Sequence, residues 1–181
     1  MKPAPFARTA ALSIALALTC ATAALPAAAK SVAEWQTITS QAKIPLEQAV
    51  TRATQAVPGK AIEAQLDDGD GMGLRYEIEV ITPGGDSVEV WVNAITGQAA
   101  QHKNDGAAKR KDRQRLEKAK STIEQAIQAA TRHTPGTPVS AELDSHWGQT
   151  SYQVEVLQAN GTLMEVKIDA VGGEVIRAKK D

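Results

Sequence analysis

The residues of this chain that could support metal chemistry are three histidines. His102, His133 and His146 lie far apart in the sequence, and none has a second histidine or a cysteine at the spacing of a zinc site. His133 falls near a predicted helix end, where a cation suits the helix dipole. We therefore expect ordinary surface histidines, no cofactor and no metal site.

One acidic cluster, running from Asp67 to Asp70 and followed by Gly71, partly matches a calcium-binding loop. Such a loop has acidic residues at positions 1, 3 and 5, glycine at position 6 and glutamate at position 12. When Leu66 is counted as position 1, the later positions fit, but position 1 itself is apolar. A strand pattern also follows where a helix is needed. The spacing favours a turn rich in glycine and aspartate between two strands, and calcium binding stays open.

Covalent catalysis finds no candidate nucleophile. The single cysteine, Cys20, lies in the N-terminal segment, and the chain contains neither a Gly-x-Ser-x-Gly nor a His-Glu-x-x-His motif. The carboxylates are too scattered to nominate a general acid and a general base. We therefore expect no catalytic residues and a protein that is not an enzyme.

Residues 1–29 have the features of a secretory signal peptide. Lys2 and Arg8 form a basic start, residues 9–25 are apolar and small, and small residues up to Ala29 supply a cleavage site. Cleavage near Ala29 predicts a periplasmic or secreted protein.

Lipid attachment at Cys20 is the alternative for this leader. Ala17 and Thr19 stand where a lipid-attachment site normally has leucine and a smaller residue, so ordinary cleavage is favoured. Either route delivers the chain across a membrane. Cleavage near Ala29 would also leave the exported chain without a thiol or a disulfide.

The charge and hydropathy of the rest of the chain argue against two kinds of partner. The sequence has 20 basic and 21 acidic residues, a balance unlike that of a general nucleic-acid binder. After the leader, no stretch approaches the roughly 18 continuous apolar residues of a membrane span. We therefore expect no nucleic acid as partner and no membrane span.

Beyond the leader, the chain is a tandem repeat. Residues 47–50, 58–59 and 64–67 match residues about 77 positions later, and residues 76–97 match residues 76 positions later. Each copy has apolar residues at helical spacing, over residues 46–57 and 123–130, and each helix pattern ends before Pro-Gly. Ser121 and Glu124 form a capping-box pattern at the second helix.

After each predicted helix the hydrophobic period changes to two. This alternation predicts antiparallel strands joined by turns rich in glycine and asparagine. The expected segments are strands at 61–67 and 138–144, hairpins with turns at 83–86 and 159–162, and short last strands at 98–102 and 174–178. The predicted fold class is α+β, with two tandem repeats that each pack one helix on a three- to four-stranded antiparallel sheet.

This organisation divides the exported chain into four parts. They are a lead-in at 30–43, the first repeat at 44–101, a basic segment at 102–120 and the second repeat at 121–178. Repeats this small bury little surface alone, so we expect them to share an interface or extend one another's sheet. The basic segment reads as a solvated linker or a helical lead-in, and the alternative is a docking site for an anionic surface or partner.

The sheet face opposite each helix holds the candidate binding residues. If the apolar members of each strand face the helix, glutamates occupy equivalent outward positions in both copies. A solvated face is the favoured interpretation, and an acidic recognition face anchored by Trp91 is the functional one. Trp147, at a hairpin tip, is a second candidate anchor. The candidate partner-binding residues are Glu79, Glu89, Trp91, Trp147, Glu155 and Glu165.

The repeat resembles the PepSY family. The family's unit has an isoleucine-led helix with a Glu-x-Ala core, then Pro-Gly, a Tyr-x-Val-x-Val strand and a Val-Asp-Ala-x-Thr-Gly close. The matching segments are residues 44–49, 58–59, 76–80 and 92–97 in the first copy and residues 123–126, 135–136, 152–156 and 168–175 in the second. The departures are Asn93 in place of aspartate and Gly172 in place of threonine.

The resemblance implies a function without catalysis. PepSY units occur in propeptides of thermolysin-type metallopeptidases and in freestanding envelope proteins, and they are proposed to restrain peptidases. Since no peptidase follows in this chain, inhibition would have to act in trans. We expect a binding module that restrains or modulates an extracytoplasmic peptidase; the alternative is a non-inhibitory envelope scaffold or sensor-accessory protein.

Overall fold

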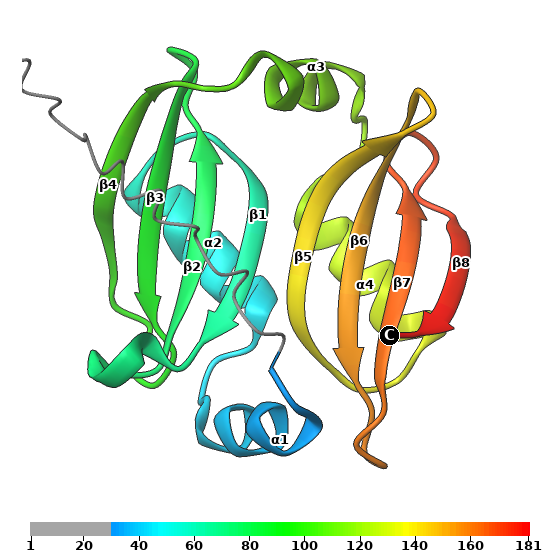
Figure 1. The fold of residues 1–181 in the computed structure, drawn as a ribbon. Helices are drawn as coiled ribbons and strands as arrows, with labels where there is room; N and C mark the ends of the chain where they lie inside the picture. The colour runs from blue at the N-terminus through cyan, green and yellow to red at the C-terminus, as the bar shows by residue number, and fades with distance from the viewer. Residues whose placement is uncertain (1–29) are drawn as a thin grey trace, which may run out of the picture.

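The computed structural model describes residues 30–181, so the predicted signal peptide lies outside the described residues. In the described part, eight strands form one antiparallel sheet in the order β4-β3-β2-β1-β5-β6-β7-β8 (Figure 1). The elements, in chain order, are α1 (Val32–Gln41), α2 (Leu46–Ala56), β1 (Lys60–Asp67), the 3-10 turn η1 (Gly69–Gly71), β2 (Arg75–Ile81), β3 (Asp86–Asn93), β4 (Ala99–Ala107), α3 (Arg110–Lys118), α4 (Ile123–His133), β5 (Thr137–His146), β6 (Gln149–Leu157), β7 (Leu163–Asp169) and β8 (Val175–Lys180).

Helices α2 and α4 cover the same face of the sheet, one behind each half (Figure 1). Their buried residues recur every three or four positions and pack on the inward side chains of the strands, as the apolar spacing predicts. A tyrosine on the sheet ties each helix start in place: Tyr76 donates a hydrogen bond to the carbonyl of Ile44 and Tyr152 to that of Ser121. The predicted α+β class with two tandem repeats is confirmed.

The cap of α4 differs from the expected one. The N-cap is Thr122, whose side chain accepts from the amide of Gln125, and the side-chain oxygen of Gln125 accepts in turn from the Thr122 amide. The hydroxyl of Ser121 instead donates a hydrogen bond to the carbonyl of Ala170, which lies 49 residues further along the chain. The prediction of a Ser121–Glu124 capping box was wrong by one residue, because the hydroxyl of Ser121 is used in this tertiary hydrogen bond.

The two repeats join through β1 and β5, which pair antiparallel over three residue pairs. Ala64 lies opposite Ala141, its counterpart in the repeat, so the junction sits on a local two-fold axis. The repeats therefore extend one another's sheet, one of the two expected ways to supply a core that a single small repeat lacks.

The basic segment between the repeats contains regular structure. β4 continues to Ala107, well past the short strand expected at 98–102, because its whole length pairs with β3 through two register shifts. The segment then forms α3. Helix α3 has a counterpart in α1, which precedes the first repeat: after each helix a backbone amide, of Lys43 or Lys120, donates to an alanine carbonyl in the last turn of its repeat.

Helices α1 and α3 lie at opposite ends of the molecule, across the junction (Figure 1). Helix α1 buries Trp35 and Ile38 in the shared core. Helix α3 buries Asp112, which pairs with Arg115, and Leu116 packs partly against the core. Each repeat thus begins with a short extra helix, and α3 lies in the segment that the sequence left open as a solvated linker or a helical lead-in.

Candidate functional site

Among residues 30–181, no helix covers the middle of the sheet face away from α2 and α4 (Figure 1), and acidic residues run across that face. Strand register places Glu89 opposite Glu79, Glu79 opposite Glu63, and Glu63 opposite Glu142. Four carboxylates therefore stand side by side on four neighbouring strands, crossing the junction between the repeats. We call Glu63, Glu79, Glu89 and Glu142 the glutamate row.

Burial and neighbouring like charges raise the cost of ionising the two glutamates at the junction, Glu63 and Glu142. The pKa of Glu63 is raised above its usual value, first by partial burial and then by Glu142 and Glu79. The pKa of Glu142 is also raised, first by burial and then by Asp144, while Arg115 and Lys111 of α3 oppose the shift. Directly opposed like charges destabilise a sheet, so the row costs stability in the free protein.

In the first repeat, the row is flanked by a stack of three side chains. Trp91 lies flat on His102, with ring centroids 3.4 Å apart, and the guanidinium of Arg75 lies 4.0 Å from the indole centroid. Its indole N–H donates to Glu89 at 2.5 Å, and the hydroxyl of Ser87 donates to Glu79 at 2.5 Å. Trp91, the expected anchor of a recognition face, is half-buried, because its neighbours on β2 and β4 cover both ring faces.

In the second repeat, the equivalent glutamates are paired. Glu155 accepts a hydrogen bond from Ser140 at 2.7 Å. Glu165 forms ion pairs with Lys179 at 3.1 Å and with Arg177 at 3.4 Å, both on the edge strand β8. These contacts offset the charge of Glu165, so the negative potential of the face is concentrated on the glutamate row.

The acidic face is hollowed on both sides of β1. One hollow of about 210 Å³ lies over β1, β5, β6 and β7, and another of about 210 Å³ lies over the first four strands. Both include Glu63 and Gln65 in their lining. The face is therefore a shallow, acidic double depression rather than a deep active-site cleft.

Trp147 lies off this face. It occupies the turn between β5 and β6, is 94% exposed, and has a φ of 50°. Its edge contacts the ring of His146, with centroids 5.6 Å apart. The structure thus separates the two tryptophans that the sequence suggested as anchors of one surface.

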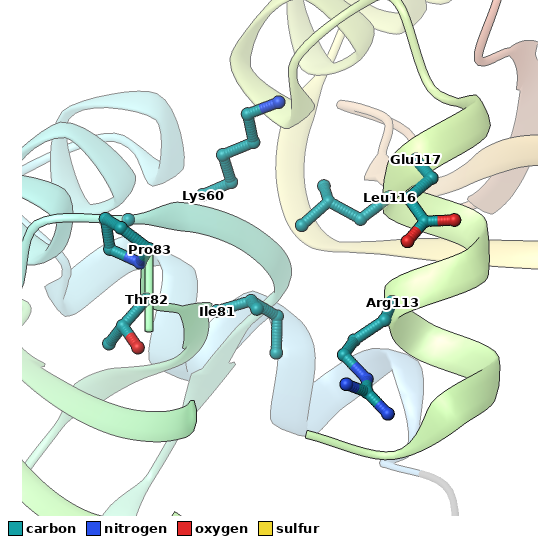
Figure 2. Close-up of a pocket in the computed structure, with 8 residues that line it drawn as sticks. Lys60, Ile81, Thr82, Pro83, Arg113, Leu116 and Glu117 are labelled. Carbon is teal, nitrogen blue, oxygen red and sulfur yellow. The ribbon is translucent and has the colours of Figure 1, made fainter. Parts of the chain in front are cut away.

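A separate cavity of about 500 Å³ lies between α3 and the ends of β1 and β2 (Figure 2). Its apolar wall includes Ile81, Pro83 and Leu116, and Lys60 and Arg113 stand on opposite sides of it. Neither cation makes a side-chain hydrogen bond or ion pair with the described residues. This cavity lies at the α3 end of the molecule.

The sequence candidates for metal binding are dispersed. Over residues 30–181, no three His, Cys, Asp or Glu side chains come together as a metal site. In the acidic loop, Asp67 accepts hydrogen bonds from the amide of Gly69 at 2.7 Å and from Lys30 at 2.9 Å. His133 contacts Thr134 at 3.1 Å at the end of α4. Asp67 therefore serves the turn that the sequence favoured.

Sequence reasoning named Glu79 and Glu89 but missed Glu63 and Glu142. Both missed residues lie in segments predicted as strands and alternate there with apolar residues, so their outward orientation was readable. That Glu63 and Glu142 lie opposite each other could not be read from the sequence, because it depends on β1 pairing with β5.

Two comparisons describe relatives of the chain. It is 31% identical over 106 residues, 59% of its length, to the uncharacterized protein YkoJ of Bacillus subtilis (strain 168). The match covers 57% of YkoJ, so the chain spans little more than half of that relative. The crystal structure of a protein titled a "putative lipoprotein" (CD1622), from Clostridium difficile 630, is 16% identical, with a TM-score of 0.44 over 80% of this chain and 97% of that one.

The family match covers both repeats. Residues 43–99 and 120–179 each match PepSY, the peptidase propeptide and YPEB domain. The two matches together take in most of the described chain, and each spans a helix and the strands that follow it. PepSY domains are non-catalytic, propeptide-like and extracytoplasmic, and they are associated with the regulation of peptidases. With its paired helix-and-sheet repeats, the chain belongs to the PepSY family.

Proposed function

We propose that this protein is an exported binding module that restrains or modulates an extracytoplasmic peptidase, and that the glutamate row is the centre of its contact surface. The observation that carries the proposal is the row itself. Four like charges on adjacent strands destabilise the free protein. A partner that brings basic groups to the face would relieve that repulsion on binding.

The surroundings of the row support this role. Trp91 is held rigid between Arg75 and His102, so its half-exposed edge needs little ordering on binding. The two hollows provide space on the face for side chains of a partner. Glu155 and Glu165 extend the surface into the second repeat, where ion pairs with β8 weaken the contribution of Glu165.

The test is capture of partners from a cell-envelope extract on immobilised protein. The test variant is Glu79→Gln/Glu89→Gln, which removes two charges of the row and keeps the side-chain shapes. The matched control is Glu117→Gln/Glu174→Gln, which removes two exposed charges away from the face. We expect a peptidase to bind the wild type and the control and to be lost with the test variant.

A direct assay decides between the two functions considered. Stoichiometric inhibition of the captured peptidase, weakened by the test variant, supports restraint. A stable complex with a non-peptidase envelope protein, without effect on proteolysis, supports the scaffold or sensor-accessory alternative. Equal capture by the wild type and the test variant would exclude the glutamate row as the contact.

A further inference from the structure

One end of the molecule combines cations with an exposed apolar tip. Figure 1 shows α3 and the β5–β6 hairpin at the same end, opposite α1. Arg115 of α3 pairs with Asp144 and donates to the hydroxyl of Ser145 at 3.3 Å, two residues before Trp147. We propose that this end docks on the surface of an anionic phospholipid membrane.

The apolar part of the tip is Trp147 together with Val171. They are 94% and 53% exposed, and the turn that holds Val171 is tied to the β6 start by a 3.1 Å bond from the amide of Ala170 to the carbonyl of Thr150. The φ of 50° at Trp147 is a conformation that bulky residues avoid, so the fold carries a cost for this residue. An indole has an apolar body and a polar N–H, and it is suited to the headgroup level of a bilayer.

The cationic part is α3 with its flanks. From Lys109 to Lys120 the chain has Lys or Arg at seven positions, against two acidic residues. Arg115 points inward to its acidic partners. Six exposed cations of this segment make no side-chain hydrogen bond or ion pair with residues 30–181, and they are Lys109, Arg110, Lys111, Arg113, Lys118 and Lys120. Each cation near an anionic membrane surface contributes about 1 kcal/mol of attraction.

The opposite end of the molecule provides an internal comparison. Met72 and Ile95 are 67% and 52% exposed there, in loops that correspond to those of Trp147 and Val171. The neighbouring helix α1 with its flanks, residues 30–43, contains two cations and one acidic residue, against seven and two at the α3 end. Both ends thus present apolar side chains, and only the α3 end adds a band of cations. This pairing of charge with an interfacial tryptophan is the reason to assign a membrane surface.

An acidic protein partner fits this end less well. Specific recognition of carboxylates uses cations that converge on a shared acceptor. Here Arg110, Arg113 and Lys118 are spread along and around a helix, which suits the diffuse charge of a lipid surface.

The test is co-sedimentation of the exported protein with vesicles of phosphatidylglycerol and phosphatidylcholine, and with vesicles of phosphatidylcholine alone. We expect binding to the anionic vesicles only, and release by high salt. Arg110→Gln/Lys118→Gln should weaken binding about tenfold or more. Trp147→Ala should weaken it several-fold and abolish the blue shift of tryptophan fluorescence on binding.

The controls are Met72→Ala and Lys43→Gln, which make matching changes at the opposite end and should bind as wild type. All variants share the same N-terminal residues, so any contribution of that segment cancels. Thermal unfolding checks that each exposed substitution leaves the fold intact. Glu79→Gln/Glu89→Gln should also bind vesicles normally, which separates this proposal from the proposed function.

Three results would overturn the membrane proposal. They are equal binding to neutral and anionic vesicles, unchanged binding of both test variants, and the absence of vesicle binding. Salt-sensitive binding of polyglutamate without binding to vesicles would assign this end to an acidic protein partner instead.

Discussion

Glu63 of β1 lies directly opposite Glu142 of β5, at the place where the two repeats join into one sheet. The pair puts two carboxylates on the exposed face of a junction that is only three residue pairs long. A junction selected for stability alone would have opposite charges or β-branched side chains here. The same feature therefore links how the repeats join to where a partner is proposed to bind.

Neutralising Glu63 should stabilise the protein at neutral pH. Its pKa is raised in the folded state, so the folded protein binds more protons than the unfolded chain just above the usual glutamate pKa. The free energy of unfolding then falls as pH rises through that window, and the cost persists at pH 7. We expect Glu63→Gln to raise the free energy of unfolding by about 0.5–1 kcal/mol at neutral pH.

Urea denaturation at two pH values measures this effect. Near pH 3 the carboxyl is protonated in both states, so Glu63→Gln should be nearly neutral there. Glu117→Gln, on the exposed side of α3, is the matched control and should change little at either pH. Destabilisation by Glu63→Gln at neutral pH would show that the row is held by favourable contacts instead.

The two tyrosine hydrogen bonds should contribute similarly to stability. Tyr76 and Tyr152 are 2% and 1% exposed, and each satisfies a carbonyl just before a helix. Replacing either by phenylalanine removes one hydrogen bond and leaves a partly buried carbonyl unpaired. We expect each variant to lose about 1–2 kcal/mol of unfolding free energy in chemical denaturation. A loss of stability for only one of the two variants would contradict the equivalence of the two hydrogen bonds.

The hydroxyls of these two tyrosines should also ionise at a higher pH than that of a free tyrosine. Burial raises the pKa of each to about 12, from the ordinary 10, and glutamates in the first turns of α2 and α4 add to the shift. Since the sequence has two tyrosines, ultraviolet titration reports on these residues alone. The folded protein keeps its protons longer than the unfolded chain, so stability should fall as pH rises from 10 toward 12. Ionisation near pH 10 with the fold intact would argue against this burial.

Helix α1 should be an integral part of the fold. Trp35 is 4% exposed and packs with Ile38 in the shared core. We expect Trp35→Ala to cost about 3–5 kcal/mol in the free energy of unfolding, measured by denaturation. Gln41→Ala, at the exposed end of the same helix, is the control. A small loss with Trp35→Ala would mean that α1 is a dispensable extension.

Much of each repeat could be predicted from local pattern. Three features depend on residues close in sequence: the apolar stripe of α2 and α4, the end of each helix before Pro-Gly, and the alternating strands. The structure has these features where the pattern placed them. Helix α3 was harder to predict, because it is charged throughout and lacks an apolar stripe. The cap of α4 was missed because Ser121 bonds to Ala170, far along the chain.

By itself, the sequence determined the duplication, the helix-then-strands order and the inward and outward side of each strand, since these follow from periodicity and turn chemistry. Only the tertiary structure decided that β1 pairs with β5, that Glu63 meets Glu142, and that Trp91 is enclosed by Arg75 and His102. It also placed α3 against the end of β5, where Arg115 pairs with Asp144. These relationships join residues far apart in the chain, and their free energy comes from packing and register across strands, which no local pattern encodes.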